Sequence, residues 1–303
     1  MKPAKVNAKA SANTATPPGE LGALLRYWRD LRGTSQLDLS FNAGVSQRHI
    51  SFIESGRSVP SRQMLIDIAQ TLDIPLRERN TLLLAAGYAP VYSDAAWNAR
   101  EMESVTRALG RMLRQHEPFP ALVMDRHWNV LMTNDAAPRF FNSFIDMAAR
   151  KGPRNMLHLI FDPQGMRPFV ADWPAVSDSL IQRVHREAVG RVADEETHAL
   201  LAELEAFSAE ASDVASAVAS ESAPQQKAAT LSPSPAMPVI PIGFVKDGEV
   251  LNYFSMVASV GTPQSIAAQE LRIECMFPAD DATEARHLAL FGTVQASASP
   301  AER

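Results

Sequence analysis

Hydrophobic residues recur at helical spacing through the first third of the chain, where five short helices are expected. The first apolar stripe ends before Gly33 and consists of Leu21, Leu24, Leu25, Trp28 and Leu31. An apolar position at every third or fourth residue indicates a helix with one buried face. The other helices are expected over about 36–43, over about 47–54, after Ser61, and from Pro75 to Gly87. Short helices with short connections predict an all-α domain, which we place at residues 19–90.

After Pro118 the pattern changes to short runs of Leu, Val, Met and Phe, which are typical of strands. These runs occupy 121–124, 128–132, 239–245, 250–260 and 271–277. Helices are expected between the two groups of strands, at about 135–147, 155–161, 173–192 and 194–207, and a last helix begins near Asp281. Strands grouped apart from helices predict an α+β domain with an antiparallel sheet.

Composition and pattern separate further regions of the chain. Residues 1–18 are rich in Ala, Thr, Lys and Pro and are expected to form a flexible tail. Residues 208–236 are rich in Ala, Ser, Pro and Gln and are expected to form a low-complexity linker. A connecting helix is expected within 91–115, the second domain covers 116–295, and a short tail covers 296–303.

Two of the expected helices and the tight turn between them lie within Ser35–Pro60. Ser35 and Ser46 stand at the N-cap positions of these helices, where a hydroxyl accepts a hydrogen bond from the first turn. Between the helices, Ala43-Gly44-Val45 supplies a small residue, a glycine suited to a turn and an apolar plug. This layout predicts a helix-turn-helix, whose second helix enters the major groove of DNA.

Long polar side chains open the second of these helices, where base edges would be read. Gln47 and Arg48 are the predicted base contacts, because Gln pairs bidentately with adenine and Arg with guanine. Phe52, one turn later, faces either a thymine methyl group or the core. The predicted contacts to phosphates are Gln36, Ser46, His49, Arg57 and Arg62.

The charge of the chain changes from one end to the other. The net charge is −5, yet residues 1–18 carry three lysines and no acid. Residues 19–80 carry eight arginines against seven acids, which leaves about −9 for the remainder. Bulk attraction to DNA is therefore modest, and specific contacts have to supply the recognition.

Composition also bounds the class of protein. Hydrophobic residues make up 46% and charged residues 21%, as in a soluble globular protein. The single cysteine, Cys275, excludes an internal disulfide and fits a reducing compartment. Neither a secretory apolar segment nor an apolar run near the roughly 20 residues of a membrane span is present, so we expect a cytoplasmic protein.

The N-terminal motif resembles the phage-repressor-type helix-turn-helix of the Xre family. The resemblance covers about 20–87 and rests on Ser35-Gln36, Ala43-Gly44-Val45-Ser46, Ile50, Ile53-Glu54 and Gly56-Arg57. It implies that Glu54, at the end of the second helix, pairs with Arg29 of the first helix in a structural role. A protein-interaction adaptor, in which the helical domain docks a protein instead of DNA, is the alternative.

Residues 116–295 resemble the MmyB-like ligand-binding domain. The resemblance rests on the segment 120–131, Asn134, Asn155-Met156-Leu157, Phe161-Asp162-Pro163 and Asp172-Trp173. It implies a PAS-like domain that holds a fatty-acid-like ligand. The candidate apolar contacts are Met124, Trp128, Met132, Phe140, Phe141, Phe144, Phe254 and Met256, although we expect most of them individually to be ordinary core residues. An anionic headgroup would meet Arg126 or Arg139, and Asn134 either binds it or caps the next helix.

The sequence contains no pattern for catalysis. A His-Glu-x-x-His motif, a P-loop and a dinucleotide-binding glycine motif are all absent. We therefore expect no catalytic residues, no metal and no cofactor. The prediction is a regulator that binds a double-stranded, palindromic DNA operator as a homodimer, without a membrane partner.

Overall fold

The protein is described by a computed structural model that covers residues 20–188, 195–219 and 241–292. The contacts within the chain divide it between Ser93 and Asp94 into two compact units. We refer to them as the N-terminal unit and the C-terminal unit, and each is described by itself.

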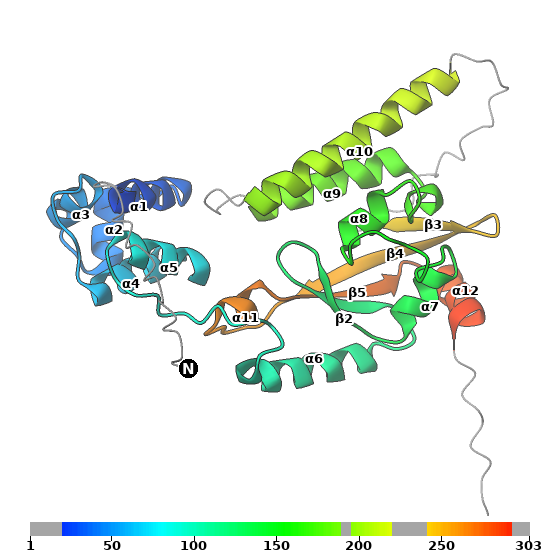
Figure 1. The fold of residues 1–303 in the computed structure, drawn as a ribbon, viewed down its shortest axis with the longest axis horizontal. Helices are drawn as coiled ribbons and strands as arrows, with labels where there is room; N and C mark the ends of the chain where they lie inside the picture. Colours follow the sequence, from blue (N-terminus) through cyan, green and yellow to red (C-terminus); the bar gives the residue numbers. More distant parts are fainter. Residues whose placement is uncertain (1–19, 189–194, 220–240, 293–303) are drawn as a thin grey trace, which may run out of the picture. The chain divides into compact units, whose positions relative to one another are not determined.

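The described part of the N-terminal unit contains five helices (Figure 1), which confirms the predicted all-α domain. They are α1 (Glu20–Leu31), α2 (Gln36–Ala43), α3 (Gln47–Glu54), α4 (Arg62–Thr71) and α5 (Leu76–Ala85). The apolar stripe of each helix points inward, and the fully buried side chains of the core include Leu25, Trp28, Leu39, Ile50, Ile53 and Ile68.

Local hydrogen bonds fix the ends of α2 and α3. Ser35 Oγ accepts a hydrogen bond from Asp38 N at 3.1 Å, and Asp38 Oδ2 accepts one from Ser35 N at 3.2 Å, which completes a capping box. Ser46 Oγ accepts one from His49 N at 3.3 Å. Gly44 ends α2 at a φ of 65°, a left-handed conformation that glycine adopts at little cost. Both predicted caps are therefore confirmed.

Gly22 allows α1 to pack directly against the end of α3. A Cβ atom added to this buried glycine would lie 2.4 Å from the carbonyl oxygen of Glu54 and 2.8 Å from that of Ile53. Carbon and oxygen atoms do not approach this closely without a shift of the backbone. The contact between the two helices thus depends on the lack of a side chain at position 22.

The described part of the C-terminal unit contains one antiparallel sheet with helices on both faces. The strands are β1 (Ala121–Met124), β2 (Val130–Thr133), β3 (Ile242–Lys246), β4 (Glu249–Ala258) and β5 (Arg272–Pro278), in the order β2-β1-β5-β4-β3. The α-helices are α6 (Glu103–Gln115), α7 (Ala136–Asn142), α8 (Met156–Phe161), α9 (Trp173–Ala188), α10 (Glu195–Ala219), α11 (Ile266–Glu270) and α12 (Asp281–Phe291). This arrangement confirms the predicted α+β domain.

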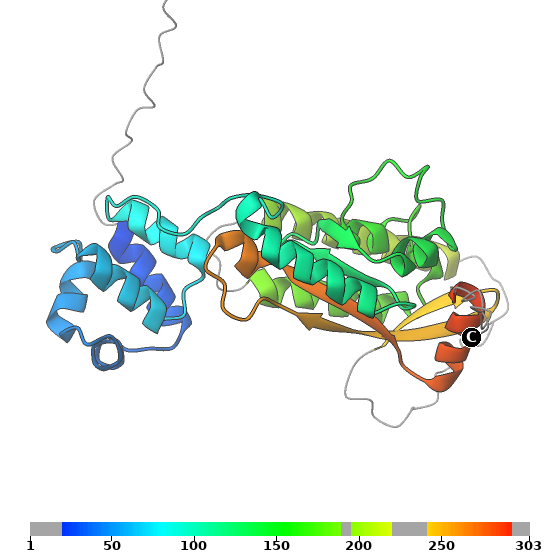
Figure 2. The same ribbon diagram turned by 90° about the horizontal axis from the view of Figure 1, so that it is seen from below.

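Alternate residues of β1 join two different cores. Leu122 and Met124 join the larger core, which also contains residues of α7 to α10 and α12. Ala121 and Val123 face the other side, where they pack with residues of α6 and with Leu271. Figures 1 and 2 show α9 and α10 along one face of the sheet and α6 along the other. All four residues of β1 are therefore buried.

A buried histidine joins α12 to the sheet. His287 is 0% exposed, and its Nε2 atom lies 3.0 Å from the carbonyl oxygen of Pro118, so this nitrogen carries the proton and donates. The other ring nitrogen, Nδ1, lies 2.8 Å from the hydroxyl of Tyr253 and accepts its hydrogen bond. Burial lowers the pKa of His287, and the charge of Arg139 lowers it further, although the bond to Pro118 acts in the opposite direction.

Several elements differ from the prediction. The predicted connecting helix is α6, which packs on the sheet through Leu109 and Leu113 and so belongs to the C-terminal unit. Residues 208–219, where the sequence predicts a linker, continue α10, because alanine-rich segments favour a helix. The five residues of α11 are too few to show a helical period. Residues 1–18, 220–236 and 296–303 lie outside the described residues.

Candidate functional site

The first turn of α3 presents two polar side chains to solvent. Gln47 and Arg48, the predicted base contacts, are both exposed, whereas Ile50 and Ile53 on the other face are buried. Ser46 caps the helix directly before them. Helix α3 therefore combines an anchored inner face with a polar outer face, as a helix that lies in the major groove requires.

Phe52 contacts two arginine side chains on the outer side of α3. The guanidinium carbon of Arg48 is 5.2 Å from the centre of the Phe52 ring, and that of Arg57 is 5.3 Å from it. At such distances an aromatic ring attracts a cation. The half-buried ring of Phe52 thus lies next to both Arg48, a predicted base contact, and Arg57, a predicted phosphate contact.

The other predicted phosphate contacts differ in their surroundings. Arg62 is exposed at the start of α4, and Ser46 is exposed at the start of α3. His49 is half-buried, with its Nε2 atom 3.3 Å from the hydroxyl of Ser58. Gln36 donates from Nε2 to Glu54 Oε2 at 2.8 Å, so its amide supports a buried carboxylate in this structure.

Glu54 ties the end of α3 to α1, as the resemblance implies. Its side chain is 1% exposed, and Arg29 donates to both of its oxygens, from Nε at 2.7 Å and from Nη2 at 3.3 Å. Burial alone would raise the pKa of the Glu54 carboxyl, but the hydrogen bonds from Arg29 and Gln36 and the charge of Arg29 outweigh it and lower the pKa. The same hydrogen bond raises the pKa of Arg29. This network holds the end of α3 against α1.

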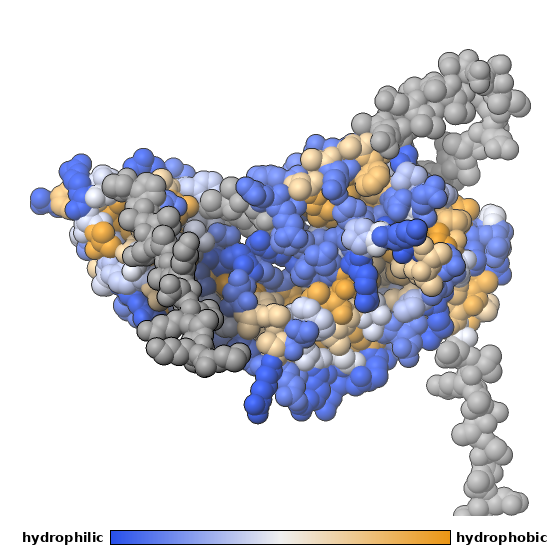
Figure 3. Space-filling model, viewed as in Figure 1, coloured by the Kyte–Doolittle hydropathy of each residue, from blue (hydrophilic) through white to orange (hydrophobic). Residues whose placement is uncertain are grey.

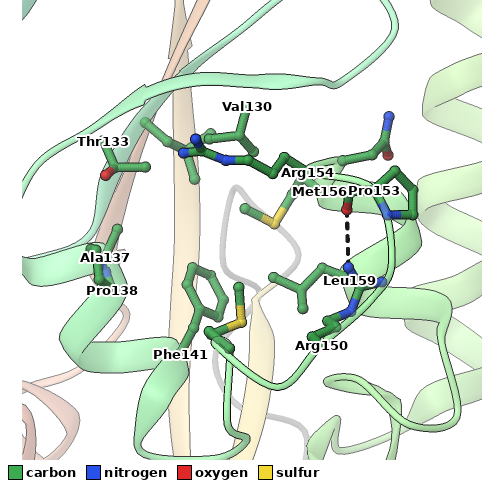
Figure 4. A pocket seen from close by; sticks show the side chains of 13 residues that line it. Val130, Thr133, Ala137, Pro138, Phe141, Arg150, Pro153, Arg154, Met156 and Leu159 are labelled. Carbon is green, nitrogen blue, oxygen red and sulfur yellow. Dashed lines mark hydrogen bonds between the residues drawn. The ribbon is translucent and has the colours of Figure 1, made fainter.

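A cavity of about 130 Å³ lies in the C-terminal unit between β1, β2, α7, α8 and the segment 147–156. Its lining is mostly apolar and includes Leu122, Val130, Phe141, Met156 and Leu159. In Figure 4 the side chains of Phe141, Met156 and Leu159 surround this space. We call this space the first cavity.

Two arginines of the segment 147–156 line the first cavity. Arg150 is committed to the protein, because it donates to the carbonyl oxygen of Pro153 at 2.9 Å and to Asp162 Oδ2 at 3.2 Å. Arg154 is exposed, and among the described residues its guanidinium has no ion-pair partner. Figure 4 shows the Arg154 side chain running along the cavity beside Val130. It therefore supplies a cation at the edge of an apolar space.

A second, smaller cavity of about 50 Å³ adjoins the first. Both are lined by Leu122, Phe141 and Met156, and the second is also lined by Trp128 and Tyr253. Trp128 contacts the guanidinium of Arg183, whose central carbon is 4.3 Å from the ring centre. The side chains of Phe141 and Met156 thus form part of the wall of both spaces.

The structure brings two of the predicted ligand contacts, Trp128 and Phe141, to these cavities. Met124 and Phe140 are instead fully buried in the larger core, against which Phe144 packs. Met132 lies on the other side of the sheet, in the core with α6. Phe254 stacks on Phe277, and Met256 is 60% exposed, so neither lines the two cavities.

The three predicted headgroup ligands have partners within the protein. Asn134 Oδ1 accepts from Ala121 N and Ala137 N, and its Nδ2 donates to the carbonyl oxygen of Phe119. Of the two roles open to Asn134, the cap is therefore the one observed. Arg139 donates to Glu117 Oε2 at 2.8 Å, and Arg126 lies 3.5 Å from Glu270 Oε1. Arg154 replaces them as the cation beside a cavity.

The sequence carries one signal for this segment, the run Arg150-Lys151-Gly152-Pro153-Arg154 before the cap residue Asn155. A cluster of cations in a loop indicates a surface for anions but does not reveal the apolar cavity behind it. The cavity is formed by strands and helices that only the fold brings together.

The described residues offer little for metal or thiol chemistry. They contain no group of three or more His, Cys, Asp or Glu side chains placed to hold a metal ion. Burial, together with the neighbouring charge of Glu274, raises the pKa of the Cys275 thiol. Among the described helices, none combines the length and apolar character needed to cross a membrane.

Comparisons with known families give two matches. A helix-turn-helix model matches residues 25–79, which contain the exposed residues of α3. A model of the MmyB-like transcription regulator ligand binding domain matches residues 105–290, more than half of the chain, and this range contains both cavities. A search of curated proteins found no match.

Proposed function

Because the chain belongs to the family of transcription regulators with an MmyB-like ligand-binding domain, we propose that a small molecule in its C-terminal unit controls how its N-terminal unit binds DNA. The two matched families support a ligand-regulated, DNA-binding transcription regulator. Such domains are non-enzymatic in general, and in our proposal the chain acts by binding and not by catalysis, in the cytoplasm where its DNA lies.

The exposed first turn of α3 carries the DNA-binding part of the proposal. Gln47 and Arg48 read base edges in the major groove, while Arg57 and Arg62 hold phosphates. As a homodimer, the protein would bind two half-sites about 10 bp apart. The buried network of Glu54 supports this role, because base readout requires a recognition helix that is held rigidly.

Selection of DNA duplexes by the full-length protein at ~150 mM salt tests this function, since non-specific binding is weak at that salt concentration. We expect one enriched, two-fold symmetric sequence. Gln47→Ala and Arg48→Ala should each cost about 1–3 kcal/mol of binding free energy and relax selection at one position. Arg62→Ala is the matched control, because loss of a phosphate contact weakens binding to all sequences alike. Selection that enriches no sequence would contradict the proposal.

The first cavity carries the ligand part of the proposal. A fatty-acid-like molecule suits it, because the lining is apolar and the exposed guanidinium of Arg154 can pair with a carboxylate at its edge. An apolar cavity of about 150 Å³ takes a molecule of the size of benzene, so the first cavity alone holds only a short apolar segment. A longer chain requires Met156 or Phe141 to move and open the second cavity.

Native mass spectrometry with saturated fatty acids of increasing chain length tests this part. We expect the acids to bind more tightly than their methyl esters, since an ester lacks the charge that pairs with Arg154. Arg154→Gln should weaken binding of the acid by about tenfold or more, in line with roughly 1.5–3 kcal/mol for a hydrogen bond to a charged group. Arg186→Gln, an exposed arginine of α9, is the control. Equal binding of acid and ester would refute the role of Arg154.

Regulation requires that the ligand distinguishes two states of the protein. A ligand that binds the DNA-competent and the DNA-incompetent states equally well shifts nothing. Operator affinity measured with and without the bound fatty acid therefore has to differ by the same factor as fatty-acid affinity measured with and without the operator.

The adaptor alternative is favoured by one observation, an apolar patch on α2. Phe41 is 77% exposed and Leu37 is 47% exposed, one helical turn apart. Exposed apolar side chains of this kind are common at protein-binding surfaces. If the adaptor function holds, Phe41→Ser should abolish capture of a protein partner, and the DNA selection described above should enrich no sequence.

A further inference from the structure

Helix α6 carries three arginines along one exposed face. Arg107, Arg111 and Arg114 follow one another at intervals of four and three residues, so they lie on the same side of the helix. All three are exposed, whereas Leu109 and Leu113 on the opposite side are buried against the sheet. We call these residues the arginine stripe. Figures 2 and 3 show α6 on the surface of the unit, with hydrophilic residues along its outer edge.

The charges of the arginine stripe are available for a partner. Arg107 Nη2 lies 2.8 Å from Glu103 Oε1, but these side chains are 63% and 65% exposed, and such a pair contributes less than about 1 kcal/mol. Arg111 and Arg114 have no ion-pair partner among the described residues. The half-buried Arg139 and Arg286, by contrast, each contact a carboxylate at 2.9 Å or less.

The arginine stripe is positively charged, whereas the unit that carries it has a negative net charge. Residues 94–303 contain 18 Lys and Arg against 27 Asp and Glu, a net charge of −9. Helix α6 contains three arginines and one glutamate. A linear set of cations on an acidic domain attracts a polyanion only along that line, because the rest of the surface repels it.

We propose that the arginine stripe binds phosphates of the DNA next to the half-site that α3 reads, an inference that rests on the proposed function. Seven residues of α-helix separate Arg107 from Arg114, a rise of about 10.5 Å. One strand of B-DNA carries a phosphate about every 3.4 Å along the axis, so three base-pair steps cover the same distance. The three guanidinium groups therefore fall within the length of four successive phosphates of one strand.

The covalent connection sets an upper limit on the distance between the end of α5 and the start of α6. Seventeen residues lie between Ala85, at the end of α5, and Glu103, at the start of α6. Fully extended, such a segment spans at most about 60 Å. Duplex DNA beside the half-site is thus the polyanion at the highest local concentration when α3 is bound.

The salt dependence of DNA binding by the full-length protein tests the proposal. The variant replaces all three arginines (R107Q/R111Q/R114Q). The control removes the same charge elsewhere on the unit (K151Q/R186Q/R286Q). The slope of log K against log salt should become shallower by about 2–3 in the variant, because each lost phosphate contact changes it by about 0.9. At ~150 mM salt, binding to specific and to non-specific duplexes should weaken on the order of tenfold or more.

Duplex length provides the second measurement. A duplex that ends at the half-sites should bind the variant and the wild type equally, whereas extension of the duplex should strengthen only the wild type. An unchanged slope, or a change equal to that of the control variant, would overturn the proposal. Binding of the wild type to vesicles of anionic phospholipid, lost in the variant without a change in slope, would also overturn it. If the wild type selects no DNA sequence, the proposed function and this inference both fail. If Gln47→Ala and Arg48→Ala reduce selectivity but the arginine-stripe variant leaves the slope unchanged, the proposed function holds and only this inference fails.

Discussion

Helix α3 and the first cavity place their candidate residues on opposite sides of the boundary between solvent and core. Gln47 and Arg48 project into solvent from α3. Three other residues of the same helix, Ile50, Ile53 and Glu54, are buried and anchor it. Around the first cavity, residues such as Leu122 and Phe141 both line the space and belong to the larger core. Recognition and stability are therefore separable in the N-terminal unit, whereas they share side chains in the C-terminal unit.

This difference determines what a mutation can report. At α3, a surface substitution changes binding with an effect on stability of about 0.5 kcal/mol or less. Among the apolar residues that line the cavity, a substitution that changes ligand binding also removes core contacts or fills space. Stability and binding have to be measured together for the C-terminal unit, and they can be measured independently for the N-terminal unit.

The largest effect is expected at the buried pair that anchors α3. Glu54→Ala removes the buried carboxylate that Arg29 contacts, although Arg29 keeps its pair with Asp30 at 2.7 Å, and should destabilise the N-terminal unit by about 3 kcal/mol, the low end for a broken buried pair. Hydrogen–deuterium exchange of α1 and α3 in the full-length protein measures the change. Gln36→Ala is the control, because loss of one neutral donor costs only about 1 kcal/mol. Equal, small effects of both variants would contradict the anchoring role.

The next effect tests whether cavity and core are one structure. Phe141→Ala should destabilise the C-terminal unit by about 3 kcal/mol, the low end for loss of a buried Phe, and should join the two cavities. Thermal unfolding with and without a long-chain fatty acid measures both consequences. We expect the fatty acid to restore more stability to the variant than to the wild type. A variant as stable as wild type would show that the cavity wall contributes nothing to the core.

The two units should also lose stability at different pH. The pKa of His287 is lowered in the folded state, so the unfolded chain binds the proton more readily, and stability falls as the pH drops below about 6.5. The pKa of Glu54 is also lowered, and its contribution is lost only below about pH 4.3. Protection factors, which correct for the intrinsic pH dependence of amide exchange, should therefore fall in α12 between about pH 7 and 5 while those in α3 stay constant.

His287→Gln identifies the source of this pH dependence. The variant should be less stable at every pH because it loses the aromatic packing, but its stability should no longer decrease across the same range. A pH dependence that is unchanged in His287→Gln would assign the effect to other groups.

The smallest effect concerns the ring beside Arg48 and Arg57. Phe52→Ala should weaken operator binding by about 0.5–1 kcal/mol, the magnitude of an exposed cation–π contact, because both arginines lose a surface that orders them. Phe41→Ala, on α2, is the matched control and should leave operator affinity unchanged. If both variants behave alike, Phe52 does not order the arginines.

The fold of the N-terminal unit was largely predictable because its signals are local. Ser35, Gly44 and Ser46 act within four residues of their own positions, and a stripe such as Leu21–Leu31 indicates its own helix. The pair of Arg29 and Glu54 follows from the resemblance and is confirmed. The use of Gln36 as a donor to Glu54 was not predictable, because an amide that reaches a phosphate can equally reach a carboxylate.

The cavity was not predictable in the same way. Strand and helix types followed from periodicity, but the assignment of an apolar side chain to the cavity or to the solid core depends on packing across several elements. Met124 and Met132 are the same residue type and both lie in short apolar strands, yet they face opposite sides of the sheet. Arg154 follows Pro153 in a loop, where no period indicates which side chains face inward. The residues assigned to DNA and to ligand contact remain predictions that the experiments above test.

The close approach at Gly22 has a consequence for genetics. Every amino-acid replacement of a glycine adds a Cβ atom, and at position 22 that atom would meet the backbone of α3 at 2.4 Å. Even alanine should therefore fail there, although alanine is the better helix former. Gly33 and Gly44 have open space where a Cβ atom would lie and resist replacement only through their positive φ values, which Asn tolerates. Functional clones from a random mutant library should thus include Asn at Gly33 or Gly44 but no substitution at Gly22. Selection for a folded regulator therefore acts on the absence of a side chain at position 22 as strictly as it acts on a buried side chain elsewhere.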